Sequence, residues 1–244
     1  MKCTFSTQCL LLLLVLFLAV PSLASASSRP QSEWDNTFSI VARDPETGAF
    51  AAAVSTARYA VGNRVPFVEY NVGAVATQAN TNVMLAKQAL ELMRDGTSAS
   101  EALEIVLGND PDRADRQLSI MDAKGGQAAF TGTKPDDFKN HLYGRNCIVA
   151  GNILVGPETL IAMVDAFEAA KGTLADRVMA TMEAGQKAGG DRRGKISAAM
   201  VVVNVPPGPY AYSKNIDLRI DSSKDPVADL RVLYEAYKAA FKIK

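Results

Sequence analysis

The order of strand-like and helix-like segments is the feature that most restricts how this chain can fold. Four β-prone segments precede the first helical pattern, and helices then come in pairs between further groups of strands. The first two segments, 37–42 and 50–54, flank the turn sequence Asp44-Pro45-Glu46-Thr47-Gly48, which predicts a hairpin. A doubly wound parallel sheet alternates single strands with single helices, so this order argues against it. The pattern instead predicts an α+β fold in which two sheets stack and a helical layer covers each.

The other expected elements follow from capping and turn residues. Asn82 is expected to cap a helix that ends near Arg94, and the capping box Ser98-Ala99-Ser100-Glu101 begins the next helix. The further strands are expected at 64–70, 72–78, 117–121, 127–131, 147–150, 197–204 and 216–220, and the further helices at 157–171, 174–187 and 225–244.

The N-terminus has the pattern of a secretory signal peptide. Lys2 supplies a positive start, residues 10–20 form an unbroken apolar run, and Ala24 and Ala26 fit an A-x-A cleavage site. A membrane anchor is the alternative, but the run is shorter than the roughly 20 residues that span a bilayer. We therefore expect a signal peptide over 1–26, a short polar leader over 27–36 and one domain over 37–244, in a secreted or periplasmic protein without a stable membrane anchor.

Charge and histidine content argue against several functions. The chain carries 26 basic and 26 acidic residues, so it has no electrostatic reason to bind nucleic acid. His141 is its single histidine, and the sequence has no G-x-S-x-G, no H-E-x-x-H and no Cys/His cluster. Nucleotide-binding motifs are also absent from the sequence. We therefore expect no metal, no organic cofactor and no Ser-His-Asp triad.

The cysteines point to a fold without an internal disulfide. Cys3 and Cys9 lie in the expected signal peptide, which leaves Cys147 alone in the mature chain. Its simplest interpretation is a small buried residue. The alternative, a cysteine hydrolase at Cys147, would require His141 as its base.

Several segments together resemble one known family. The similarity runs from Thr37 to the C-terminus in one register and is clearest at 37–48, 72–82, 151–156, 189–199 and 217–231. On these segments the sequence resembles the family called domain of unknown function 1028, whose members are Ntn-hydrolase-like. The sequence departs from many relatives at 133–141, where they carry Cys, Trp and Gly-His, and this predicts a different substrate preference.

The resemblance implies the four-layer αββα sandwich of the Ntn hydrolases. It also implies that the first residue of the mature domain is the nucleophile, and that residue is Thr37 here. A threonine hydroxyl needs a nearby base, and an α-amine that titrates near 7.7–8.0 can serve on the same residue. A second cut, between Asn36 and Thr37, would be required to free that amine. The expected function is an exported hydrolase of a small amide or peptide-like bond.

Further residues are candidates for the same site. The resemblance implies that Ser55, after the second strand, lies near groups that tune the nucleophile. Asn80 lies at a strand-to-helix junction, where an amide side chain can hold a developing oxyanion, so we expect both residues to assist Thr37. The expected substrate-binding residues are Arg58, Gln78, Asn82, Asn152, Asp191 and Arg192.

Two questions stay open at the level of sequence. A non-catalytic exported binding protein on the same fold is the alternative to the hydrolase, because a threonine that is never freed has no base. A homodimer is plausible for stacked sheets of this kind. The expected ligand in either case is a small molecule.

Overall fold

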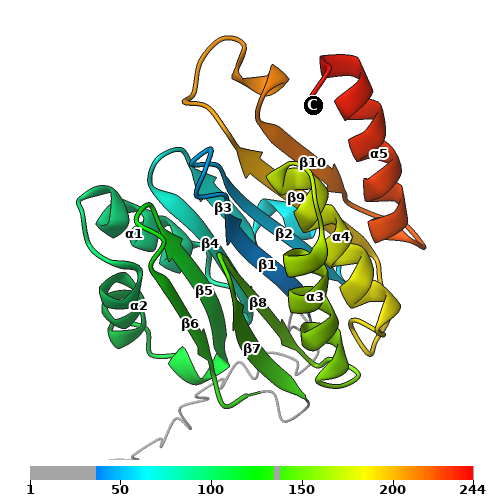
Figure 1. Ribbon diagram of the computed structural model, residues 1–244. Helices are drawn as coiled ribbons and strands as arrows, with labels where there is room; N and C mark the ends of the chain where they lie inside the picture. The colour runs from blue at the N-terminus through cyan, green and yellow to red at the C-terminus, as the bar shows by residue number, and fades with distance from the viewer. Residues whose placement is uncertain (1–36, 135–137, 244) are drawn as a thin grey trace, which may run out of the picture. The chain divides into compact units, whose positions relative to one another are not determined.

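The computed structural model describes residues 37–134 and 138–243, in which it contains two antiparallel sheets and five α-helices (Figure 1). The signal peptide and leader expected at 1–36 lie outside the described residues. The strands are β1 (Thr37–Arg43), β2 (Phe50–Thr56), β3 (Pro66–Glu69), β4 (Gly73–Ala79), β5 (Arg116–Asp122), β6 (Gln127–Thr131), β7 (Lys139–Gly144), β8 (Cys147–Asn152), β9 (Ser197–Val203) and β10 (Ile216–Ile220). The helices are α1 (Val83–Arg94), α2 (Ala99–Gly108), α3 (Glu158–Ala169), α4 (Leu174–Lys187) and α5 (Pro226–Phe241).

One sheet has six strands and the other has four. The six-stranded sheet has the order β10-β9-β2-β1-β8-β7, and the four-stranded sheet has the order β3-β4-β5-β6. The predicted hairpin is confirmed, because β1 pairs with β2 from Thr37 opposite Thr56 to Arg43 opposite Phe50. This pairing places β1 in the middle of the larger sheet, between β2 and β8.

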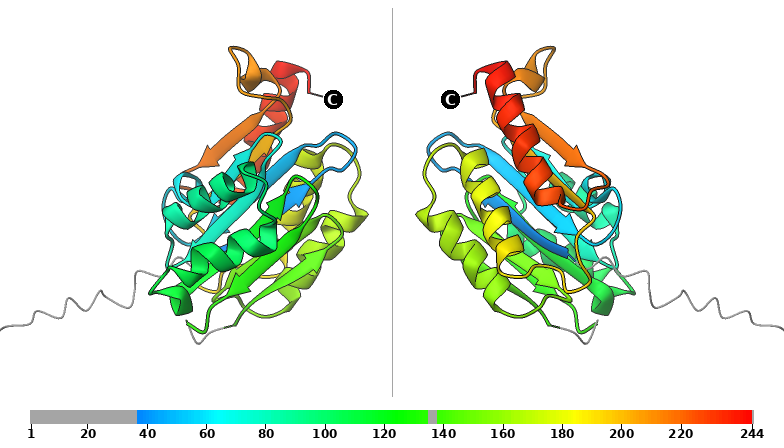
Figure 2. Two further views of the ribbon diagram at one scale, coloured as in Figure 1. Left: turned by 90° about the vertical axis from the view of Figure 1, so that its left-hand side faces the viewer. Right: turned by 90° about the vertical axis from the view of Figure 1, so that its right-hand side faces the viewer.

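Each sheet packs against helices as well as against the other sheet. Helices α1 and α2 contact β3, β4, β5 and β6, whereas α3, α4 and α5 contact strands of the six-stranded sheet (Figures 1 and 2). Three clusters of buried hydrophobic residues correspond to these contacts. Two lie between a sheet and its helices, and the third lies between the sheets.

Strand alternation decides which side chains of β1 face the other sheet. Phe38 and Ile40 belong to the cluster beneath α3, α4 and α5, whereas Val41 belongs to the cluster between the sheets. Since successive side chains of a strand point to opposite faces, Thr37 and Ser39 share the inter-sheet face with Val41. These five side chains are completely buried, as expected for a central strand covered on both faces.

The main difference from the sequence prediction is β7, which was not expected. Its sequence, Lys-Asn-His-Leu-Tyr-Gly, has few strand-forming hydrophobic residues, and most of its side chains are half-buried or exposed. The reason is its place at the edge of the six-stranded sheet, where one side of the strand lacks a partner. Strand β3 is also shorter than expected, at Pro66–Glu69.

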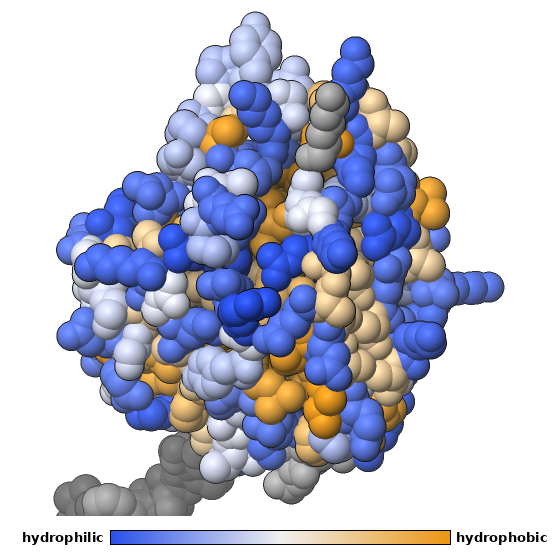
Figure 3. Space-filling view, in the orientation of Figure 1, coloured by the Kyte–Doolittle hydropathy of each residue, from blue (hydrophilic) through white to orange (hydrophobic). Residues whose placement is uncertain are grey.

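The predicted helix starts are confirmed. The side chain of Asn82 accepts a hydrogen bond from Met84 N–H, and Ser98 and Glu101 form both bonds of the capping box. Among the described residues, no helix is both long and apolar enough to cross a membrane. On the face seen in Figure 3, hydrophilic residues predominate and strongly apolar residues occur in small groups.

Candidate functional site

A row of polar residues crosses the six-stranded sheet at the end where β1 begins. Thr37 lies opposite Thr56 of β2 on one side and opposite Asn152 of β8 on the other. The row continues from Thr56 to Ser197 of β9, and from Asn152 to Lys139 of β7. Directly opposed residues share a face, so all five side chains point toward the four-stranded sheet.

The four-stranded sheet presents a matching polar row. Gln78 of β4 lies opposite Gln117 of β5, which in turn lies opposite Thr131 of β6. Ala76 and Met121, on the same faces of β4 and β5, belong to the hydrophobic cluster between the sheets. Alternation therefore directs this second row toward the six-stranded sheet.

The amide of Gln117 joins the two rows. Its Oε1 accepts hydrogen bonds from Gln78 Nε2 at 2.7 Å and from Asn152 Nδ2 at 3.0 Å. Its Nε2 has three acceptors within hydrogen-bond distance, Thr131 Oγ1 at 2.9 Å and the backbone carbonyls of Gly151 at 3.0 Å and Asn140 at 3.1 Å. The side chains of Gln78, Gln117 and Asn152 are almost completely buried, so this network ties the sheets together away from water.

These bonds fix the orientation of all three amides. A backbone carbonyl only accepts, so the Gln117 nitrogen must face Gly151 and its oxygen must face the other two amides. Gln78 and Asn152 must then turn their nitrogens to Gln117, which leaves Gln78 Oε1 and Asn152 Oδ1 without a hydrogen-bond partner. Ser39 Oγ and Ser119 Oγ, on the same inter-sheet faces, also lack one among the described residues.

His141 lies at the margin of this network, and Cys147 is remote from it. His141 Nδ1 is 2.9 Å from Thr131 Oγ1, and burial lowers the pKa of His141, which favours a neutral ring at neutral pH. Cys147 belongs to the hydrophobic cluster on the helix-covered face of the sheet, opposite to the face that carries His141. Burial, with a contribution from Glu168, raises the pKa of Cys147 to about 12. The structure therefore argues against the cysteine-hydrolase alternative, since His141 lies on the other face of the sheet and burial disfavours the thiolate.

Asp191 holds two loops together beside the row. Its carboxylate accepts hydrogen bonds from the backbone N–H groups of Ala57 and Arg193, both at 2.9 Å, and pairs with the Arg193 guanidinium at 3.3 Å. It thereby fixes the segment that contains Arg58, whose carbonyl accepts a hydrogen bond from Ser197 Oγ. Arg192 is exposed, so of the two expected substrate-binding residues in this loop only Arg192 presents its side chain to solvent.

Arg116 holds the loop that follows β4, as Asp191 holds the loops beside Thr56. Its Nη1 donates to the carbonyl oxygen of Asn80 at 2.5 Å, while its guanidinium pairs with Asp110 at 2.6 Å and with Asp112 at 3.2 Å. The backbone of Asn80 is thus held next to the end of β4. Asn82, which follows, uses its side chain to cap α1.

Ser55 is not brought together with Thr37. Ala51 and Ala53 belong to the cluster beneath α3, α4 and α5, so alternation places Ser55 on that helix-covered face. Thr56, the next residue, is the cross-strand neighbour of Thr37 on the inter-sheet face.

The backbone is strained immediately after Gln78 and Asn152, the two amides whose oxygens lack a partner among the described residues. Ala79, which follows Gln78, has φ 69°, and Ile153, which follows Asn152, has φ 51°. A positive φ is rare for residues other than glycine and is especially unfavourable for a β-branched side chain such as that of Ile153. Such strain occurs often at functional sites.

Sequence reasoning missed several members of this site. It did not single out Gln117, Thr131, Ser39 or Ser119, and it considered His141 only as the base that a cysteine hydrolase or a Ser-His-Asp hydrolase would need. One signal was present, because small polar residues alternate with large apolar ones in β1 and β5. Which face they occupy became clear only from the packing of the two sheets.

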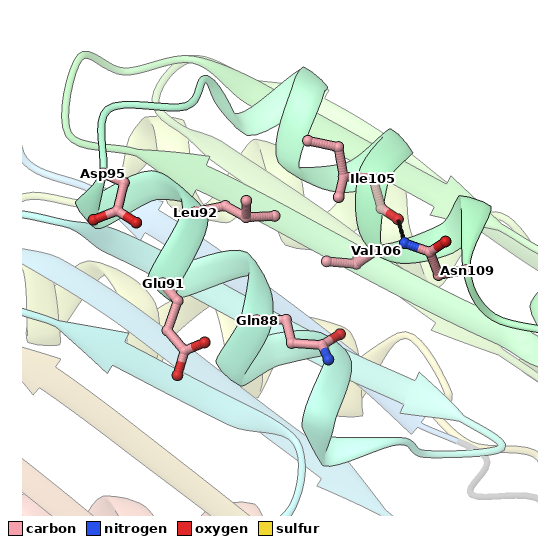
Figure 4. A pocket seen from close by; sticks show the side chains of 7 residues that line it. All are labelled: Gln88, Glu91, Leu92, Asp95, Ile105, Val106 and Asn109. Carbon is pink, nitrogen blue, oxygen red and sulfur yellow. Dashed lines mark hydrogen bonds between the residues drawn. The ribbon is translucent and has the colours of Figure 1, made fainter.

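A groove also lies away from the polar rows, between α1 and α2 (Figure 4). Its volume is about 370 Å³, and Leu92, Ile105 and Val106 form its apolar part, with Glu91 and Asp95 nearby. No strand residue lines it, so it is separate from Thr37. Within the ranges that the structure covers, no group of three or more His, Cys, Asp or Glu residues is arranged to hold a metal ion.

The structure thus defines a mixed α/β protein of two antiparallel sheets with a buried polar site where the sheets meet. A family profile described as "Family of unknown function (DUF1028)" matches residues 37–230, and the chain belongs to this family. The match begins at Thr37, the first residue of β1.

Two solved structures allow a comparison of the fold. Protein SPO2555 from Silicibacter pomeroyi, of the same family, is 36% identical over 83% of this chain and 86% of its own, with a TM-score of 0.75. Anbu (ancestral beta-subunit) from Yersinia bercovieri is 10% identical over 83% of this chain and 95% of its own, with a TM-score of 0.35. A search of curated proteins found no match.

Proposed function

We propose that this protein is an exported hydrolase that cleaves a small amide with Thr37 as an N-terminal nucleophile. The observation that carries the proposal is the position of Thr37, which begins both the family match and the central strand of the larger sheet. It also lies beside Asn152, a member of the buried amide network. We further propose that the two sheets and their helices form the four-layer αββα sandwich of the Ntn hydrolases.

The reaction would use groups of Thr37 itself. The Thr37 hydroxyl attacks the amide carbonyl carbon while its proton passes to the α-amine, and the C–N bond then breaks as the departing amine takes up that proton. Water hydrolyses the resulting ester and regenerates the threonine. Asn152, the cross-strand neighbour of Thr37, would orient the substrate.

Release of the α-amine is the condition for this chemistry. In the full chain Asn36 precedes Thr37, and a peptide nitrogen is not a base. We propose that signal cleavage is followed by a cut between Asn36 and Thr37, by self-processing or by another protease. Export and the homodimer expected from the sequence stay predictions.

The experiment compares wild-type protein with Thr37→Ala and Thr37→Ser in a screen of small amides that detects released amine or ammonia. We expect Thr37→Ala to lower kcat/KM by a factor of about 1,000 or more, because it removes the nucleophile. Thr37→Ser retains a hydroxyl and is expected to keep measurable activity. Equal activity of wild-type protein and Thr37→Ala would reject the proposal.

A non-catalytic binding protein is the second candidate. The observation that favours it is the complete burial of Thr37 in the full chain. This candidate predicts that no amide is consumed and that the purified protein still carries residues before Thr37.

A further inference from the structure

Four buried oxygen atoms between the sheets, on residues near the end of the sheet where Thr37 lies, have no hydrogen-bond partner among the described residues, and folding alone does not explain this. Buried polar groups are nearly always hydrogen-bonded, because an unpaired one costs about 1–3 kcal/mol. Ser39, Gln78, Ser119 and Asn152 are each about 1% exposed or less, and within the described ranges each has one side-chain oxygen without a partner. They come from four strands of both sheets, and all four face the space between the sheets.

The four residues lie close to Thr37. Asn152 is its direct neighbour, and Ser39 is two residues further along the same face of β1. Gln78 and Asn152 both bind the same atom, Gln117 Oε1, so their amide groups adjoin each other. Ser119 is two residues from Gln117 on the same face of β5.

The chemistry of these atoms specifies what would satisfy them. The Gln78 and Asn152 oxygens are carbonyl oxygens and only accept hydrogen bonds, whereas the two serine hydroxyls can donate or accept. A primary carboxamide offers two N–H donors on one nitrogen and one acceptor oxygen. Its two N–H groups can donate to the two carbonyl oxygens, and its oxygen can accept hydrogen bonds from the serine hydroxyls.

We propose that this inter-sheet site binds an unsubstituted –NH2 group of a primary amide, with Gln78 Oε1 and Asn152 Oδ1 accepting its two N–H bonds. Ser39 and Ser119 supply hydroxyl groups to the same ligand. The inference rests on the proposed function, because it takes this primary amide as the substrate. Ammonia is then the leaving group. Amides with alkyl groups on nitrogen lack the donors and are poor ligands.

The test uses probes that cannot be hydrolysed. NMR titration measures how tightly they bind to the wild-type protein. Methanesulfonamide carries an –NH2 group and acceptor oxygens, and N,N-dimethylmethanesulfonamide lacks the N–H donors. We expect saturable binding of methanesulfonamide and at least tenfold weaker binding of the dimethyl compound. Equal binding of the two, or no binding of either, would overturn the inference and leave ordered water as the partner of these oxygens.

A matched pair of variants locates the binding. Ser39 and Ser55 lie on adjacent strands, are both buried and both have an unpartnered hydroxyl, but Ser55 faces the helices. Ser39→Ala is expected to weaken methanesulfonamide binding by about five- to tenfold, the effect of one hydrogen bond, whereas Ser55→Ala stays within twofold. Ser119→Ala is expected to behave like Ser39→Ala, and equal effects of the Ser39 and Ser55 variants would contradict the site.

Probe binding and amide turnover test the two proposals separately. Selective probe binding without turnover of any amide would support the site and reject the hydrolase. Turnover of amides without probe selectivity, or turnover of N-alkyl amides as fast as primary ones, would support the hydrolase and reject this inference.

Discussion

At the scale of residues, the site depends on the Gln117 side-chain amide, whose oxygen and nitrogen both have hydrogen-bond partners. Gln117 receives two hydrogen bonds from other side chains, and its nitrogen faces two backbone carbonyls and the Thr131 hydroxyl. These contacts connect strands of both sheets. Its neighbours Gln78 and Asn152 each keep one oxygen that has no partner in the described part of the chain. Gln117 therefore positions the groups that we assign to ligand binding, and it does not itself offer an atom to the ligand.

Removal of this amide should be costly for stability. Gln117→Leu leaves several buried partners without hydrogen bonds, so we expect the free energy of unfolding to fall by about 3 kcal/mol or more. Gln127→Leu is the control, because Gln127 is half-buried and its Nε2 makes one long bond, of 3.4 Å, to a carbonyl. Urea unfolding measures both variants, and similar losses in the two would contradict this role of Gln117.

Cys147 should be inert in the folded protein. Its pKa near 12 leaves almost no thiolate at pH 8, and its side chain is completely buried. We expect iodoacetamide to label Cys147 only after denaturation, as measured by mass spectrometry. Rapid labelling of the native protein would show that the burial of this thiol is misjudged.

At the scale of elements, the sequence predicted helices and turns better than edge strands. Asn82 and the Ser98–Glu101 box identified helix starts because capping is encoded locally, within three residues. Strand β7 escaped prediction because an edge strand needs few hydrophobic residues and is defined by its partner, β8.

The same difference between local and non-local information explains which site residues the sequence predicted and which it missed. Thr37, Gln78 and Asn152 were proposed from the sequence, and all three lie in the buried polar rows. Ser55 was proposed because the resemblance implies nucleophile-tuning groups after the second strand, but a shift of one residue along a strand moves a side chain to the other face. Gln117 was missed because its partners lie on strands far away in sequence.

Helices α4 and α5 are joined by a polar contact with a clear pH dependence. Burial would raise the pKa of Asp176, but hydrogen bonds from Lys238, Thr173 and Tyr234 outweigh it and lower the pKa to about 2. A carboxylate with a lowered pKa stabilises the fold above its unfolded-state pKa, near 4, and this contribution disappears as the pH falls through about 2.

We therefore expect part of the stability to be lost between about pH 4 and pH 2 through Asp176. Asp176→Asn should flatten the pH dependence of the melting temperature in this window. Asp165→Asn, at an exposed position on α3, is the control and should leave that dependence unchanged. A wild-type-like slope in Asp176→Asn would contradict the assignment.

At the scale of the whole molecule, the family domain begins with the residue to which we assign the chemistry. The profile match starts at Thr37, and SPO2555 shares the fold over most of both chains. The residues before Thr37 have the pattern of a signal peptide and a leader. The central claim is therefore that the functional protein begins at Thr37, with a free α-amine at the start of β1.

The most direct test is the intact mass and N-terminal sequence of the mature protein isolated from its native host. The account predicts that the chain begins at Thr37. A mature chain that begins at Ser27, or at any other residue before Thr37, would contradict the N-terminal nucleophile and favour the binding protein.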